Sequence, residues 1–223
     1  REPGPRREPA GDRSAEPRQA ARTHEWTLAT ALRSPRFWGL GGTFFAGSFT
    51  SQLLLVHQVA YFVDHGLTPL VAASVVGVVG LASIAGKVGW GWLSDLIGRE
   101  LTFTLGFSCV VLSVGVLGLF AGHPHPSLPF FYGVLIGVGY AVTAPLSPAA
   151  ASDLFRGRHF GAIFGTLNLS NSFGGAVGAW AGGWIFDLTR SYAWALWIAL
   201  VFAVAAPLLL WLVAPRRPHP APG

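Results

Sequence analysis

Residues 71–121 read VAASVVGVVGLASIAGKVGWGWLSDLIGRELTFTLGFSCVVLSVGVLGLFA. Two apolar runs, residues 71–92 and 101–121, flank a short polar turn that contains Asp95 and Arg99. A membrane-spanning helix needs about 20 apolar residues, because each residue rises about 1.5 Å through a hydrocarbon core about 30 Å thick. A spanning strand would need only about 10 residues of alternating polarity, which neither run shows. The stretch therefore predicts two transmembrane helices joined by a tight turn.

The same pattern extends over most of the chain. Long apolar stretches fall at residues 37–62, 71–92, 101–121, 128–149, 160–186 and 192–214, and Lys87 is the one formal charge inside them. Residues 1–36 are rich in Arg, Pro and Glu, so they cannot bury enough apolar surface to offset their ordering entropy. The sequence predicts an all-α integral membrane protein: six transmembrane helices over residues 37–214, a disordered linker at 1–36 and a polar tail at 215–223.

The composition argues against two large classes of protein. Charged residues make up 11% of the 223 residues, against about 25% in soluble domains, and residues 1–36 hold 13 of the 25 charges. The rest of the chain could not cover a soluble surface, so a soluble enzyme and a nucleic-acid-binding protein are excluded despite the net charge of +5. The single cysteine and the His123–His125 pair are too few for a metal site. We expect no catalytic residue, no metal and no cofactor.

The distribution of arginines predicts the orientation in the membrane. With the N-terminal segment in the cytoplasm, the inner side collects the eight arginines of residues 1–36, then Arg99, Arg156, Arg158 and the pair at 216–217. The outer side holds only Arg190. Because basic residues accumulate on the cytoplasmic side, we expect a multi-pass protein of the cell (inner) membrane with both termini in the cytoplasm.

Small residues and prolines indicate how the helices meet. Small residues four apart let helix backbones approach closely in lipid, where no hydrophobic force drives association. Pro145 and Pro148 interrupt the fourth span, where each removes a backbone hydrogen bond and can bend the helix. Small residues at this spacing occur in the fifth and fourth spans: Gly174, Gly178, Gly182, Gly133 and Gly137.

The polar turn after residue 92 resembles the signature loop of the major facilitator superfamily, whose pattern is Gly-x-Leu-Ala/Ser-Asp-basic-x-Gly-Arg-basic. Leu96 and Glu100 replace two basic residues of that pattern. The resemblance implies that the turn belongs to a cytoplasmic gate. The matching residues are Gly91, Leu93, Ser94, Asp95, Gly98 and Arg99.

Members of this superfamily have twelve helices in two halves of six, joined by a long polar cytoplasmic loop. Residues 1–36 resemble that loop, and the six spans resemble the second half. Residues 59–67 and 182–192 resemble the monocarboxylate and oxalate–formate branch, although Arg190 stands where that branch usually has Gly. The absence of methionine and the start at Arg1 agree with a fragment that lacks the N-terminal half.

The resemblance implies secondary active transport of a small solute by alternating access. We expect an organic monocarboxylate, coupled to a proton or a counter-anion, with the lipid bilayer and the missing six-helix half as the other partners. Two alternatives stay open. The chain could belong to an exporter of drugs or other neutral or cationic solutes, or it could be a non-transporting six-helix interaction protein.

Neutral polar residues near the middle of the spans are the first candidates for a solute path. Polar side chains buried in membranes tend to face the bundle interior or a water-filled cavity. The alternative is that they hold helices together by hydrogen bonds of about 0.6 kcal/mol each. The candidates are Gln52, Tyr140, Thr143, Asn168 and Asn171.

Lys87 and His57 are the ionisable candidates. A cation at a helix centre costs about 2.5–3.5 kcal/mol on insertion scales, so Lys87 either binds an anion or couples a proton, or its side chain reaches back to the interface. His57 could accept a proton in an outer vestibule, since histidine is the side chain suited to proton exchange under physiological conditions; alternatively it is an interfacial residue with a hydrogen bond.

Overall fold

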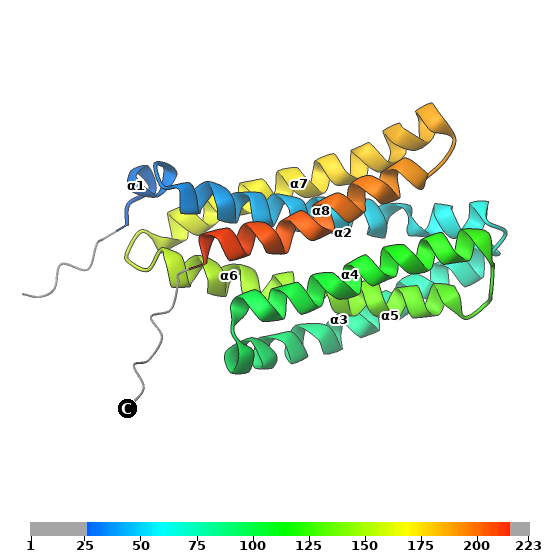
Figure 1. Ribbon diagram of the computed structural model, residues 1–223, viewed down its shortest axis with the longest axis horizontal. Helices are drawn as coiled ribbons and strands as arrows, with labels where there is room; N and C mark the ends of the chain where they lie inside the picture. The colour runs from blue at the N-terminus through cyan, green and yellow to red at the C-terminus, as the bar shows by residue number, and fades with distance from the viewer. Residues whose placement is uncertain (1–25, 215–223) are drawn as a thin grey trace, which may run out of the picture.

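The computed structural model describes residues 26–214, and all of its regular structure in that range is helical (Figure 1). The six predicted spans coincide with long helices, so the predicted all-α membrane fold is confirmed. The fourth span is divided between two helices. The elements are α1 (Leu28–Leu32), α2 (Pro35–Asp64), α3 (Pro69–Ile97), α4 (Arg99–Gly122), α5 (Leu128–Ala141), α6 (Thr143–Leu154), α7 (Phe160–Thr189) and α8 (Ala193–Val213).

The short helix α1 lies in the segment that the sequence predicts to be disordered. The Thr27 hydroxyl caps α1 by accepting a hydrogen bond from the Thr30 amide. Trp38 Nε1 donates to the carbonyl oxygen of Leu32 at 2.9 Å, and Ala31 is fully buried. The end of the linker is therefore packed on the bundle, and the expectation of disorder does not hold for residues 28–32. Residues 1–25 and the tail at 215–223 lie outside the described residues.

The starts of α2 and α3 follow from their sequences. Each begins with a proline, Pro35 or Pro69, whose missing N–H is not needed in the first turn of a helix. Each is preceded by a hydroxyl side chain that accepts a backbone hydrogen bond: Ser34 from the Arg36 amide and Thr68 from the Val71 amide. These caps fix where both long helices begin.

The fourth span is broken at Val142, between α5 and α6. The ring of Pro145 conflicts with the carbonyl of residue 141, four residues earlier, and Pro145 has no N–H to offer it. The Val142 amide bonds to the Gly139 carbonyl instead of to Val138, which would be its partner in an unbroken helix. Trp90 Nε1 of α3 donates to the freed Val138 carbonyl oxygen at 2.7 Å. A side chain from a neighbouring helix thus satisfies the backbone at the break, as the hydrocarbon core requires.

The helices form an arc rather than a closed ring. Each helix packs on the next in the spatial order α7, α2, α8, α4, α5, α3, and no contact joins α3 to α7 among the described helices. Figure 1 shows α7, α2 and α8 along one side of the molecule and α4, α5 and α3 along the other. We call the uncovered side of α2, α5 and α6 between α3 and α7 the open face.

Glycines mark the closest helix contacts, as their spacing predicts. A Cβ at Gly174 would lie 2.8 Å from the Phe45 Cα of α2, and one at Gly178 would lie 2.9 Å from the Phe49 Cα. Between α3 and α5, a Cβ at Gly137 would lie 2.8 Å from the Ala82 Cβ. Only glycine permits these backbones to approach so closely.

Hydropathy separates the helices into two kinds. Among the described residues, four units are long and apolar enough to cross a membrane by composition alone: Pro69–Ile97, Arg99–Gly122, Leu128–Leu154 and Ala193–Val213. The two others, α2 and α7, have 30 residues each but carry more polar side chains. These two helices pack closely on each other and border the open face.

Candidate functional site

The polar turn between α3 and α4 has the tight geometry that its glycine predicts. Gly98 ends α3 and begins α4 with φ at 95°, a conformation that L-residues rarely adopt. Its amide bonds to the Ser94 carbonyl at 3.1 Å, and its carbonyl accepts the Thr102 hydroxyl at 2.8 Å. The turn therefore places Asp95 and Arg99 on adjacent helix ends. We call this end of the bundle the motif end.

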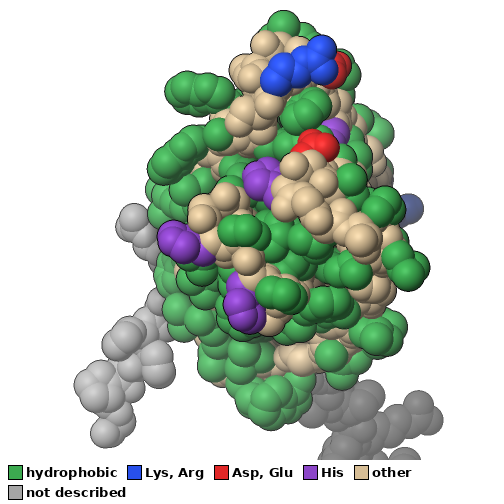
Figure 2. Space-filling view, turned by 90° about the vertical axis from the view of Figure 1, so that its right-hand side faces the viewer, with side chains coloured by type: hydrophobic (Ala, Val, Ile, Leu, Met, Phe, Trp, Pro, Cys, Tyr) green, Lys and Arg blue, Asp and Glu red, His purple; other side chains and the backbone are tan. Residues whose placement is uncertain are grey.

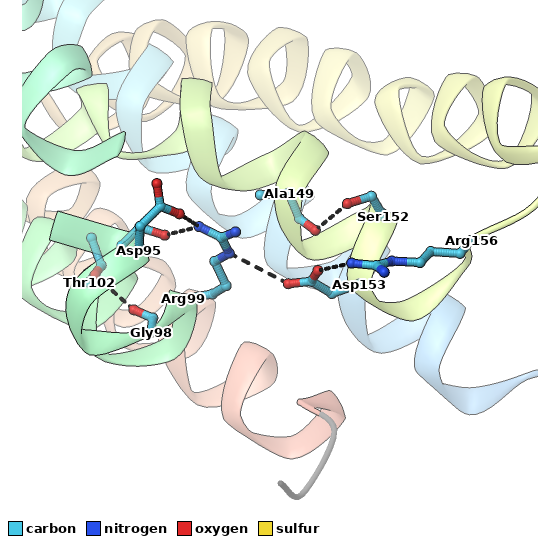
Figure 3. A network of polar contacts seen from close by, with 9 residues as sticks. Asp95, Gly98, Arg99, Thr102, Ala149, Ser152, Asp153 and Arg156 are labelled. Atoms are coloured by element: carbon cyan, nitrogen blue, oxygen red, sulfur yellow. Dashed lines mark hydrogen bonds and ion pairs between the residues drawn. The ribbon is translucent and has the colours of Figure 1, made fainter. Parts of the chain in front are cut away.

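Arg99 donates hydrogen bonds to several polar side chains at the motif end (Figure 3). Its Nη1 atom donates to Asp95 Oδ1 at 2.8 Å and to Ser94 Oγ at 2.5 Å. Its Nε atom points to α6, where it donates to Asp153 Oδ2 at 3.5 Å. The guanidinium thus joins the α3–α4 turn to the end of α6. The Asp95 side chain is 72% exposed, so that pair is well solvated, whereas Asp153 is 32% exposed.

Asp153 is the functional candidate that sequence reasoning missed. It also pairs with Arg156 of the following turn, at 3.5 Å between Oδ1 and Nη2. The sequence signal was present, because Asp153 and Arg156 form an acid–base pair three residues apart beside the fourth span. Its link to Arg99, 54 residues away, depends on the packing of α6 beside α4, which cannot be predicted from the local sequence.

Asp95 belongs to the last turn of α3 and does not cap the next helix. Helix α3 runs on to Ile97, and the cap of α4 is Gly98, without a side-chain hydrogen bond. Asp95 therefore acts as the partner of Arg99. Gly91 lies one turn before Asp95, and a Cβ there would be 3.8 Å from the Pro145 Cβ of α6.

Lys87 lies on the side of α3 that turns toward α6. It is one helical turn before Gly91 and two turns after Gly80, so the three share a face. Its side chain is exposed, and no hydrogen bond or ion pair within residues 26–214 involves it. Trp92 and Leu81 are exposed on a different side of the helix. The lysine therefore borders the open face rather than the bundle core.

Three amide side chains lie where α2 and α7 meet the open face. Asn168 and Asn171 share a side of α7 with Gly175, and a Cβ at Gly175 would lie 3.1 Å from Gln52 Cγ of α2. Gln52 is exposed, and both asparagines are half-buried. No hydrogen bond holds any of these three amides in the part of the chain that the structure describes.

Two of the remaining candidates, Thr143 and His57, donate hydrogen bonds to backbone carbonyl oxygens. The Thr143 hydroxyl donates to the Tyr140 carbonyl oxygen at 2.8 Å, directly beside the break at Val142. His57 Nε2 donates to the carbonyl oxygen of Ala179 at 2.8 Å, which joins α2 to α7. That contact matches the interfacial alternative for His57.

The fold and the charged turn together define a helical membrane protein. The chain belongs to the Major Facilitator Superfamily, whose sequence profile matches residues 38–223. This is a family of transporters and not of enzymes.

Several curated proteins are similar to this chain. The oxalate:formate antiporter of Oxalobacter formigenes is 28% identical over 222 residues, which cover 94% of this chain and 50% of that protein. Monocarboxylate transporter 12-B of Danio rerio is 26% identical over 216 residues, which cover 95% of this chain and 43% of that protein. The uncharacterized transporter YcxA of Bacillus subtilis is 28% identical over 169 residues, or 72% of this chain and 40% of that protein. The chain spans about half the length of these relatives.

Proposed function

We propose that this chain is the C-terminal half of a secondary transporter that moves small organic carboxylates by alternating access. The observation that carries the proposal is Lys87, a cation in a membrane span that has no acidic partner among the described residues. Two similar proteins are named for monocarboxylate and for oxalate and formate, which supports an anionic solute.

The charge of Lys87 needs a counter-charge in the membrane. Lys87 lies eight residues before Asp95, about 12 Å deeper at about 1.5 Å per residue. An unpaired cation within a span costs about 2.5–3.5 kcal/mol, and a solute carboxylate at the open face would offset that cost. The described residues offer one such cation, which matches a solute with one carboxylate.

The uncharged polar groups complete the solute path. If these residues served to hold the bundle together, we would expect Gln52, Asn168 and Asn171 to bond across helices. None of the three side chains has a hydrogen-bond partner within residues 26–214. Together with Tyr140 and Thr143 they offer hydrogen bonds to a polar solute that has lost its water. We assign His57 a supporting role, because it is already bonded to α7.

The network at Arg99 acts as a gate in this proposal. It joins α3 and α4 to α6 while the motif end is closed, and it would separate when that end opens. Each exposed ion pair is worth about 0.2–1 kcal/mol, which suits a contact that must break in every transport cycle.

The proposal also includes the orientation of the chain in the membrane, its partner half and its driving force. The motif end faces the cytoplasm of the cell membrane, with both termini on that side, as the arginines favour. A second six-helix half covers the open face, because transporters of this kind bind solute between two halves. A proton or a counter-anion supplies the driving force.

Uptake into liposomes tests the proposal. The natural protein that carries this sequence is reconstituted, and uptake of labelled lactate, formate and oxalate is measured with and without a proton gradient or internal counter-anion. Lys87→Ala is expected to lower carboxylate uptake about 10–150-fold, since a hydrogen bond to a charged group is worth about 1.5–3 kcal/mol. Lys87→Arg keeps the charge and should retain part of the uptake.

Val88→Ala is the matched control, because Val88 is the next residue on α3 and is exposed on a different side of the helix. Equal uptake by Lys87→Ala and Val88→Ala would refute the role of the lysine. Transport of neutral or cationic solutes without any carboxylate uptake would favour the exporter alternative. No uptake of any solute by folded protein would favour the non-transporting alternative.

A further inference from the structure

A large cavity lies away from the open face, between α2, α4 and α8. Its volume is about 580 Å³, which is within the range of small-molecule sites. It lies at the end of the bundle opposite the motif end, which we call the distal end. Helix α4 lines it with Gly115 and Gly118, α8 with Leu196 and Trp197, and α2 with Tyr61 and His65.

The cavity is placed to open toward lipid. Helices α4 and α8 are neighbours in the middle of the arc, far from the uncovered sides of α3 and α7. Leu112 and Trp197 line the cavity and are 59% and 64% exposed on the outside of the bundle. A partner that covers the open face would therefore leave this cavity in contact with the membrane.

The length of the cavity matches one leaflet of a bilayer. On α4 its lining runs from Ala121 to Val111, ten residues apart. At about 1.5 Å per residue this is about 15 Å, half of a hydrocarbon core about 30 Å thick. With its mouth at the distal membrane surface, a cavity of this length would reach about the middle of the bilayer.

Polar groups occur at the mouth of the cavity and not along its walls. Ser191, Tyr192 and His65 lie at the distal end, where the turns of the bundle meet. Figure 2 looks onto this end and shows histidines and a few charged side chains on a largely apolar surface. The Tyr61 hydroxyl is already bonded to the Leu117 carbonyl at 2.7 Å, and His65 Nδ1 to the Tyr61 carbonyl at 2.7 Å. The Ser191 hydroxyl oxygen accepts from the Ala193 amide at 3.2 Å, so His65 Nε2 and the O–H of Ser191 are the groups that remain for a ligand headgroup.

We propose that this cavity holds one acyl chain of a phospholipid from the distal leaflet, with the lipid glycerol and headgroup beside His65 and Ser191. An apolar chain fits the walls, the depth fits one leaflet, and the polar mouth lies where lipid esters lie. The glycines of α4 make the space, because a Cβ at Gly115 or Gly118 would meet nothing within 4 Å.

Side chains that fill the cavity provide the test. Gly115→Leu and Gly118→Leu place a large apolar group where the acyl chain would lie, and leucine is a good helix former, so both variants should fold. Gly115→Ala leaves most of the space. Gly89→Leu on α3 is the matched control, because Gly89 is also exposed with nothing within 4 Å of its Cβ but lies outside the cavity.

Native mass spectrometry counts the phospholipids that stay bound after purification in mild detergent, and thermal unfolding checks that each variant is folded. We expect each leucine variant at Gly115 or Gly118 to lose one retained lipid per chain, and Gly115→Ala and Gly89→Leu to lose none. The proposal is overturned if the wild-type protein retains no lipid, if the cavity variants retain as many as the wild type, or if Gly89→Leu loses as many. The proposal would also be overturned if the retained mass were that of a second copy of the protein instead of a phospholipid.

Discussion

The close packing of α2 on α7 leads to a sharp prediction for Gly178→Ala. A Cβ at this position would lie 2.9 Å from both the Cα and the carbonyl carbon of Phe49. Ordinary van der Waals contact begins at about 3.4 Å, and the obstructing atoms belong to a helix backbone, which cannot rotate away as a side chain can. The two helices must therefore move apart along their whole contact, which also contains the hydrogen bond from His57 to Ala179.

The magnitude follows from a comparison with Gly165→Ala on the same helix. Alanine favours a helix over glycine by about 0.8–1.0 kcal/mol, and this gain is common to both variants. A Cβ at Gly165 meets nothing within 4 Å, so only Gly178→Ala carries the cost of overpacking, about 1–3 kcal/mol. We expect the unfolding equilibrium constants of the two variants to differ by about 5–150-fold, with Gly178→Ala the less stable.

Equilibrium unfolding in mixed micelles, followed by tryptophan fluorescence, measures this difference. Both variants are compared with the wild-type protein at the same lipid-to-detergent ratio. If Gly178→Ala is as stable as Gly165→Ala, then α2 and α7 do not approach as closely as described. The argument that glycines set their separation would then be wrong.

Three further substitutions test other contacts. Asp153→Asn weakens the link to Arg99, and such pairs are worth about 0.2–1 kcal/mol. The accessibility of a cysteine introduced at the motif end should therefore rise up to about fivefold, and unchanged accessibility would count against the gate. Gln58→Leu removes a buried side-chain oxygen without a partner among the described residues, so the melting temperature should stay the same or rise, and a marked fall would contradict this. Trp90→Phe leaves the Val138 carbonyl unsatisfied beside the break, so the free energy of unfolding should fall by about 1–3 kcal/mol; no change would mean that another donor serves that carbonyl.

The sequence predicts the helices well because the hydrocarbon core imposes a length that is readable from composition. It also predicts the tight turn at Gly98 and the interruption caused by Pro145, since both depend on local backbone chemistry. Short α1 could not be found this way. Its stability comes from contacts such as Trp38 with the Leu32 carbonyl, which exist only after the bundle has formed.

The candidate site was predictable only in part. The motif shows that Asp95 and Arg99 belong together, because residues four apart in a helix are neighbours. Asp153 reaches Arg99 through the packing of α6 on α3 and α4, which no local pattern reveals. The hydrogen bond from His57 to the Ala179 carbonyl of α7 could not be predicted either, because the two residues are 122 positions apart in the sequence.

The order of the arc has a consequence for how the protein is made. Helix α2 is synthesised first among the long helices, yet its main neighbours are α7 and α8, at the far end of the described chain. The Thr50 hydroxyl bonds to the Ala199 carbonyl 149 residues later, and His57 bonds to Ala179 122 residues later. At about 5–20 residues per second these partners reach the ribosome exit roughly 6–30 s after α2. During that interval α2, one of the less apolar helices, lacks these partners and needs shelter from lipid, so the insertion machinery must hold it until α7 and α8 have been made.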